Sequence, residues 1–157
     1  ARGQIGKGRY RLGAGGMDGA AASPFAGKDL CCDCSGFVCW CLGTSRLVRD
    51  PFALTKNGGG LNTTQIALDA KTPKKGVFNI VEMRDAKPGD TIAYPWDGQM
   101  IGHTGVVSAV QGGVVTHVIH CSMGNQRKLG HAVAETDARP FLARRDTIIA
   151  RYVGLED

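Results

Sequence analysis

The order of apolar and polar positions divides the chain into a first half with helical segments and a second half rich in strands. The opening is glycine-rich and irregular up to Leu30, and Ser35 to Leu42 then forms a run that is apolar on nearly every side. Asp33 precedes this run as a candidate N-cap, and Gly43 follows it with the residue type that suits a left-handed C-terminal position. We therefore predict a buried helix over Cys34–Leu42.

One more helix and five strands are predicted further along the chain. A loop from Pro51 to Asn62 leads to a second short helix over Thr63–Ala70, for which Asn62 is the candidate cap. The predicted strands carry β-branched residues between turn signals and are Val77–Met83, Asp90–Tyr94, His103–Val110, Val114–Cys121 and Thr147–Val153. Residues 122–140 are polar and show no period, so we predict an irregular segment there.

Helices that precede antiparallel strands indicate an α+β fold with the helices on one face of the sheet. The chain has 157 residues, close to the usual size of one domain, and it contains no internal repeat or dividing linker. We therefore treat residues 1–157 as a single domain.

Composition and charge narrow the classes of function. Apolar residues make up 43% and charged residues 21%, which is typical of a folded globular chain. No stretch approaches the roughly 18 apolar residues that a membrane span requires, and the first residues show no signal-peptide pattern. The net charge of +5 is compatible with an anionic partner, but the aromatic content of 6% offers no stacking platform, so we expect no nucleic-acid binding.

The cysteines point to chemistry rather than to a disulfide scaffold. Five of the six fall between Cys31 and Cys41, whereas Cys121 lies far away, and a scaffold would spread them along the chain. Cys34 sits where the first helix is predicted to begin, so unpaired N–H groups and the helix dipole favour its thiolate and could hold an oxyanion. The alternative is that Cys34 is a small buried hydrophobe.

Strand register identifies which histidines could cooperate with that cysteine. A two-residue turn at Gly112-Gly113 places Gly105 opposite His120, which makes His103 and His120 diagonal neighbours on one face. His117 then points to the other face. A three-residue loop or a bulge would reverse this and pair His117 with His103 instead.

The segment Asp33-Cys34-Ser35-Gly36-Phe37-Val38 resembles the nucleophile motif of the NlpC-type cell-wall cysteine peptidases, a papain-like superfamily. Further landmarks of that family follow in the same order, over most of the chain: Tyr10-Arg11-Leu12-Gly13-Ala14-Gly15-Gly16, Lys87-Pro88-Gly89-Asp90, Gly102-His103-Thr104-Gly105-Val106-Val107 and Ile119-His120-Cys121-Ser122. The resemblance implies a nucleophile helix packed on an antiparallel sheet.

The resemblance also implies roles for particular residues. Cys34 would be the nucleophile, His103 its base and His120 the residue that orients His103, the role that asparagine plays in papain-like triads. Tyr10 would help to place the substrate or the oxyanion.

Asp33 and Ser35 resemble positions that bind the free amino terminus of a stem peptide in some members of the family. The implied reaction is hydrolysis of an amide in peptidoglycan stem peptides, at a D-glutamyl-γ-diaminopimelate bond, through a thioester. No metal or organic cofactor is needed. We expect the protein to act in the periplasm or at the cell wall after export, delivery or lysis, and an immunity or delivery partner stays unknown.

Two alternatives remain open at this point. A related amidase or acyltransferase would use the same Cys–His pair on another amide or ester. A zinc module would use the cluster Cys31, Cys34, Cys39 and Cys41, although its second pair is spaced by only one residue and the helix would scatter these side chains.

Overall fold

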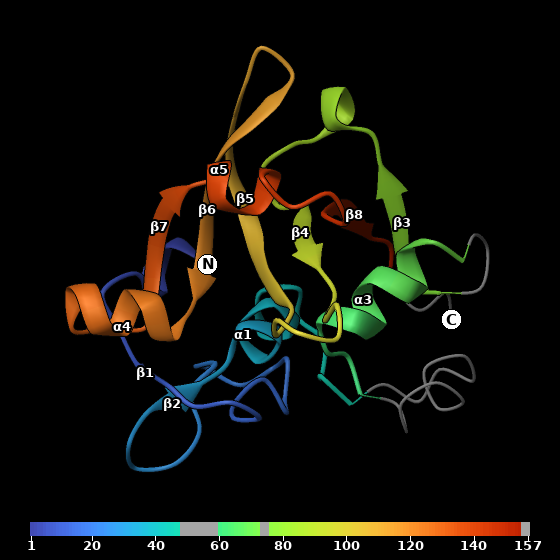
Figure 1. Ribbon diagram of the computed structural model, residues 1–157. Coiled ribbons are helices and arrows are strands. Elements are labelled where there is room, and N and C mark those ends of the chain that lie inside the picture. Colours follow the sequence, from blue (N-terminus) through green and yellow to red (C-terminus); the bar gives the residue numbers. More distant parts are fainter. Residues whose placement is uncertain (48–59, 73–75, 155–157) are drawn as a thin grey trace.

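In the computed structural model of the protein, a six-stranded antiparallel sheet forms the centre of the molecule. The structure describes residues 1–47, 60–72 and 76–154. The strands are β3 (Phe78–Val81), β4 (Thr91–Tyr94), β5 (His103–Gln111), β6 (Val114–Cys121), β7 (Val133–Asp137) and β8 (Ile148–Tyr152). Their spatial order is β3-β8-β4-β5-β6-β7, which Figure 1 shows from right to left. The last strand of the chain thus lies between β3 and β4.

The remaining elements are short. The helices are α1 (Cys34–Cys41), α3 (Thr63–Ala70), α4 (Met123–Leu129) and α5 (Arg139–Leu142), with 3-10 helices at Arg2–Gln4 and Met83–Asp85. A separate two-stranded parallel sheet pairs β1 (Arg9–Tyr10) with β2 (Cys31–Cys32), immediately before α1. In the described residues no helix is long and apolar enough to cross a membrane.

Both helices predicted from the first half of the sequence are present and begin at the predicted caps. The Asp33 side chain accepts a hydrogen bond from the Gly36 N–H, and the Asn62 side chain accepts one from the Gln65 N–H. Gly43 has a φ of 71°, as the left-handed position after α1 requires. The loop predicted from Pro51 to Asn62 lies mostly outside the described residues.

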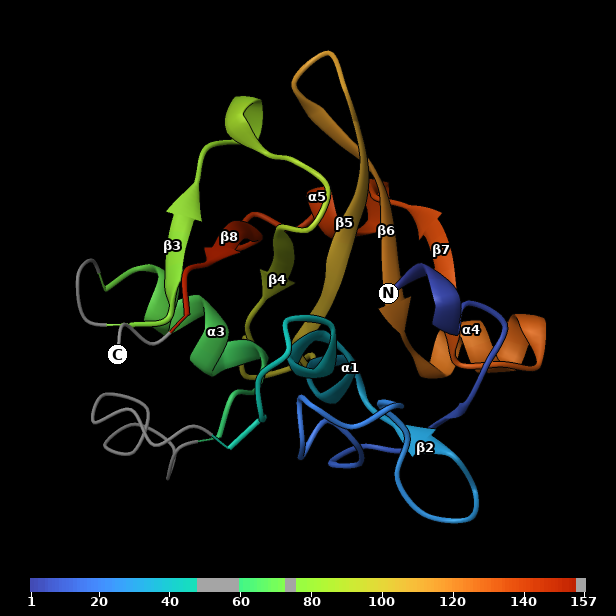
Figure 2. The same cartoon turned by 180° about the vertical axis from the view of Figure 1, so that it is seen from behind.

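Helices cover both faces of the sheet, because α5, which was not predicted, lies opposite the two predicted helices, α1 and α3, which share one face as expected. Ala93 and Ile148 pack with α3 in one apolar cluster, while the alternate residues Ile92 and Ile149 pack on the opposite face with Phe141 of α5. Strand residues alternate between faces, so each strand contributes to two cores. Figure 2 shows α5 from behind the sheet.

The segment 122–140 is also more regular than predicted, because it contains α4, β7 and the start of α5. The Ser122 side chain caps α4 by accepting from the Asn125 N–H, and Gly130 ends the helix with a φ of 81°. The helix buries only Asn125, so it has no apolar stripe that a sequence pattern could have revealed.

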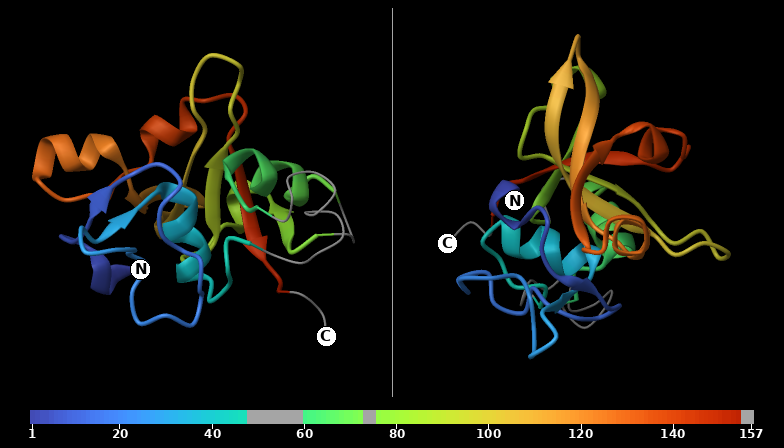
Figure 3. Two further views of the ribbon diagram at one scale, coloured as in Figure 1. Left: turned by 90° about the horizontal axis from the view of Figure 1, so that it is seen from below. Right: turned by 90° about the vertical axis from the view of Figure 1, so that its left-hand side faces the viewer.

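The β5–β6 hairpin has the predicted two-residue turn and the predicted register at both ends. Gln111 lies opposite Val114, and Val106 lies opposite Ile119. Between these pairs the register shifts once and then shifts back, so that Ala109 lies opposite His117. The two irregularities cancel, and the residues near the start of β5 keep the register that a simple hairpin would give. The hairpin extends beyond the rest of the sheet (Figure 3).

Candidate active site

A buried charge network holds the start of α1. The Asp33 carboxylate accepts hydrogen bonds from the Gly36 N–H at 2.8 Å, the Gly13 N–H at 2.7 Å and the Ser35 hydroxyl at 3.2 Å. Arg46 completes the network with an ion pair to Asp33 at 3.0 Å, and these two side chains are only 12% and 2% exposed. The capping carboxylate therefore has a counter-charge inside the protein.

Glycines allow the chain to wrap closely around this helix start. A Cβ atom on Gly36 would lie 2.7 Å from the Gly15 carbonyl oxygen, and one on Gly16 would lie 2.1 Å from the Gly36 oxygen. The tyrosine-plus-glycine segment and the nucleophile motif thus fit together backbone against backbone, which a side chain at either glycine would prevent.

The Cys34 thiol is buried at the first position of α1, and its surroundings favour the neutral form. Burial, and next the Asp33 carboxylate, raise the pKa of Cys34 to about 12. The N–H groups of Ser35, Thr104 and Cys34 act in the opposite direction, as expected at a helix start, but they do not outweigh burial. The helix start thus acts in the direction that the sequence predicts, and burial outweighs it in this conformation.

Tyr10 lies beside the thiol. Burial raises the pKa of the Tyr10 phenol, and its interactions with Cys34 and Asp33 act in the same direction. The Tyr10 N–H donates a hydrogen bond to the side-chain oxygen of Gln126, so α4 fixes the strand that carries this tyrosine.

His103 and His120 are in direct contact, as the hairpin register predicts. The His103 Nε2 and the His120 Nδ1 lie 2.7 Å apart, and the His120 Nε2 lies 2.9 Å from the Thr136 hydroxyl. That hydroxyl in turn donates to the Asp137 carbonyl at 3.5 Å. Because the Thr136 hydroxyl donates to that carbonyl, its oxygen accepts a hydrogen bond from the His120 Nε2–H. The His120 Nδ1 then accepts one from the His103 Nε2–H.

With this direction of donation, each ring carries its proton on Nε2. The remaining ring nitrogen of His103, Nδ1, then carries a lone pair and has no hydrogen-bond partner among the described residues. Burial, and next the neighbouring His120, lower the pKa of His103 to about 3, and burial lowers the pKa of His120 to about 4. Both rings are therefore neutral at neutral pH.

An aromatic wall holds the histidine pair on the sheet. The Phe141 ring stacks on His103 with 5.3 Å between centroids and meets the edge of His120 at 5.5 Å. Tyr94 packs against both Phe141 and His103. The end of the segment 122–140, predicted to be irregular, thus begins α5, the helix that carries Phe141.

Two glycines allow close packing on either side of His103. A Cβ atom on Gly105 would lie 2.9 Å from the His120 Cβ, and one on Gly102 would lie 2.3 Å from the Thr63 hydroxyl. Gly102 is therefore pressed against the start of α3, immediately before His103.

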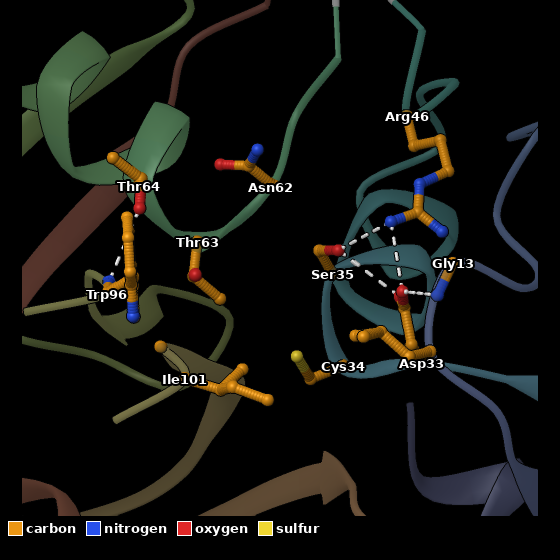
Figure 4. Close-up of a pocket in the computed structure, with 12 residues that line it drawn as sticks. Gly13, Asp33, Cys34, Ser35, Arg46, Asn62, Thr63, Thr64, Trp96 and Ile101 are labelled. Carbon is orange, nitrogen blue, oxygen red and sulfur yellow. Dashed lines mark hydrogen bonds and ion pairs between the residues drawn. The ribbon is translucent and has the colours of Figure 1, made fainter. Parts of the chain in front are cut away.

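Two cavities of about 390 Å³ each lie at the site, and Cys34 lines the first of them. Cys34, Asp33, Ser35 and Arg46 line the first, together with Trp96 and Ile101 on its far side (Figure 4). Tyr10, Tyr94, His103, His120 and Met123 line the second, and the Ile101-Gly102 segment borders both. In Figure 4 the Cys34 sulfur points into the space between Trp96 and the Asp33–Arg46 pair.

The predicted site residues lie around these cavities, but the nucleophile and its base are not yet in contact. Cys34 and His103 make no hydrogen bond with each other among the described residues, although the Thr104 N–H, next to His103, contacts the thiol. Catalytic hydrogen bonds are often long in free enzymes and tighten when substrate binds. His117 is exposed, and its ring contacts the hydroxyl of the adjacent Thr116.

Four supporting residues were not identified from the sequence: Arg46, Gln126, Thr136 and Phe141. Each acts through a partner at least 13 positions away, so no local motif marks it. No group of three or more metal-binding side chains converges within the described residues, so the zinc-module alternative gains no support.

Comparison with known families decides the class of this site. The model of the CHAP domain matches residues 25–125, well over half of the chain, and this match includes both Cys34 and His103. The chain belongs to the CHAP domain family. CHAP domains are cysteine peptidases or amidases of the NlpC and papain-like type that are associated with peptidoglycan hydrolases, so this protein is an enzyme of that class. No curated protein matches the chain.

Membership in the CHAP family confirms the resemblance to papain-like cell-wall peptidases, and the structure confirms the α+β fold. The matched range ends at residue 125, at the start of α4. Thr136 and Phe141, which support the histidine pair, therefore lie beyond the matched range.

Proposed function

We propose that this CHAP domain hydrolyses the D-glutamyl-γ-diaminopimelate bond of peptidoglycan stem peptides, with Cys34 as nucleophile, His103 as base and His120 as the orienting residue. The observation that carries the proposal is the hydrogen-bond chain from Thr136 through His120 to His103. It leaves the His103 Nδ1 as a proton acceptor next to the strand residue that contacts the Cys34 thiol.

The proposed reaction proceeds by acyl transfer. The Cys34 sulfur attacks the amide carbonyl while its proton passes to the His103 Nδ1, because neither partner is charged at rest. The C–N bond of the tetrahedral intermediate then breaks, and His103 gives the proton to the leaving amine. A water molecule, deprotonated by His103, attacks the thioester, and the acid product leaves with the thiol restored.

Charge on the tetrahedral oxygen is stabilised by donors already in place. The N–H groups at the start of α1 face the thiol, and the Tyr10 hydroxyl lies on the same side. Such donors act strongly in a site with little water. In this proposal Asp33 and Ser35 line the substrate cavity and hold the helix start in place.

The test is mass spectrometry of purified muropeptides after incubation with the enzyme. Cys34→Ala should abolish cleavage, and His103→Ala should reduce it nearly as far, since the thiol then has no base. Cys41→Ala, at the other end of α1, is the matched control and should stay active. The masses of the products identify the bond. Cleavage at a different stem-peptide bond would overturn the bond assignment, and full activity in Cys34→Ala would overturn the mechanism.

A further inference from the structure

The cavity between Cys34 and Trp96 lies where the acyl half of the substrate would bind. His103 returns its proton to the leaving amine, so the amine half leaves past the second cavity, which the two histidines line. The first cavity contains Cys34 and no histidine, and it therefore holds the acyl half. Stem peptides are joined to the glycan by their amino ends, so the sugar lies on the acyl side of every bond within the stem.

The charges in this cavity do not suit a free amino terminus. Among the described residues, Asp33 is the acidic residue that lines it. The carboxylate already accepts three hydrogen bonds and pairs with Arg46 at 3.0 Å. The charge of the carboxylate is therefore already compensated. An ammonium group bound there would also lie close to the positive charge of Arg46 and be repelled by it. In the part of the chain that the structure describes, the site that would bind the amine in related enzymes thus carries one acidic and one basic side chain and no net charge.

The opposite wall is apolar and exposed. Trp96 and Ile101 line this wall and are 61% and 68% exposed, so large apolar surfaces face solvent at its mouth. Ligand sites are typically lined by apolar and aromatic side chains with a few polar groups that fix orientation. A pyranose ring offers the matching surface, because one of its faces is composed of C–H groups.

The backbone that carries Trp96 is held in place before any ligand binds. The Trp96 backbone N–H donates to the Thr64 hydroxyl at 3.3 Å, and the neighbouring Asp97 forms an ion pair with Arg144 at 2.8 Å. Arg144 also lies over the Tyr94 ring. A backbone segment that is already fixed loses little conformational entropy when a ligand packs on the side chain it carries.

We propose that Trp96 is a specificity-determining residue that packs on the muramyl sugar of the acyl half, so that the enzyme selects stem peptides still attached to glycan over peptides with a free amino end. The proposal rests on the function proposed above. It predicts two separate preferences, one for an uncharged amino end and one for the sugar.

Three substrates with the same stem peptide separate these preferences: the free amine, the N-acetyl peptide and the N-acetylmuramyl peptide. We expect kcat/KM to rise at each step, by roughly tenfold for the sugar, as expected for one good aromatic contact. Trp96→Ala should remove the advantage of the sugar, chiefly through KM, and should keep the difference between the free amine and the N-acetyl peptide. Trp96→Phe should retain much of the sugar preference.

Ile80→Ala is the matched control, because Ile80 is a similarly exposed apolar residue on β3, and it should behave as the parent enzyme. Equal kcat/KM for the N-acetyl and muramyl peptides, or a sugar preference that survives Trp96→Ala, would overturn the role of Trp96. Faster cleavage of the free amine would overturn the argument from charge. No cleavage of any of the three would overturn the proposed function itself, and the inference with it.

Discussion

The nucleophile side and the histidine side of the cleft are held by opposite kinds of interaction. Around Cys34 the supports are charges and backbone groups, with Asp33 and Arg46 at the centre. Around His103 the supports are neutral rings and one hydroxyl, with Phe141 and Thr136 as the main contacts. The first arrangement fixes a helix end, whereas the second fixes the protonation state of a base.

This difference predicts different weaknesses for the two sides. Removing a charge from a buried pair leaves its partner uncompensated, so the nucleophile side should fail through stability. The histidine side depends on two rings staying neutral, so it should fail through protonation and loss of orientation.

The largest effect is expected from Arg46→Leu. It leaves the buried Asp33 without its counter-charge and should lower the free energy of unfolding by about 3–5 kcal/mol. Denaturant unfolding measures this. Arg139→Leu, which breaks the exposed pair with Asp137, should leave stability unchanged. If both variants lose the same amount, the network around Asp33 has no special structural role.

Acid should act on the other side of the cleft. The pKa values of His103 and His120 in the folded state are lowered to about 3 and about 4, below the usual 6.5. Between these lowered values and pH 6.5, the unfolded chain therefore binds more protons than the folded chain. Stability is therefore complete above pH 6.5 and falls as the pH drops, by up to about 1.4 kcal/mol per pH unit for each ring.

Thermal unfolding between pH 5 and 6.5 measures this slope. His120→Gln should flatten it, whereas His117→Gln should not, because His117 is exposed. A slope that is the same in all three proteins would show that other groups cause it.

A smaller effect is expected from removing the orienting ring. His120→Ala should reduce turnover of a stem peptide by about one to two orders of magnitude, less than the loss of Cys34 or His103, since water can partly replace its hydrogen bond. His117→Ala should change almost nothing. Circular dichroism checks folding. Loss of activity in His117→Ala, with His120→Ala near wild type, would transfer the third role to His117.

The smallest effect is expected at the end of the hydrogen-bond chain. Thr136→Val keeps the shape of the side chain but removes the acceptor for His120, so kcat should fall by roughly fivefold, about the value of one hydrogen bond. Thr136→Ser should restore it. A valine variant with full kcat would show that Thr136 does not position the rings.

The elements that sequence predicts well are those with local signals. Both predicted helices have a capping side chain next to an apolar run, and Gly112-Gly113 sets the hairpin turn by its positive φ values. The prediction that His103 pairs with His120 follows from the length of that turn. It survives the irregular middle of the hairpin because the two register shifts cancel.

The parts that sequence does not predict depend on distant contacts. The first helix of segment 122–140, α4, is polar and seven residues long, so no periodicity marks it. Arg46 lies 13 positions from Asp33 and Thr136 lies 16 positions from His120, and only the folded chain brings them together. The resting thiol at Cys34 is a further example, because a helix start is visible in a sequence and the depth of burial is not.

The tip of the β5–β6 hairpin is a practical attachment point because it lies far from the histidines. The turn at Gly112-Gly113 lies at the far end of the hairpin from His103 and His120, and it projects beyond the neighbouring strands (Figure 1). The pairs near the histidines are set by contacts with β4 and β7 as well as by the turn. A fluorescent or affinity peptide inserted between the two glycines would therefore label or immobilise an active enzyme, and its movement over a cell wall could be followed by microscopy.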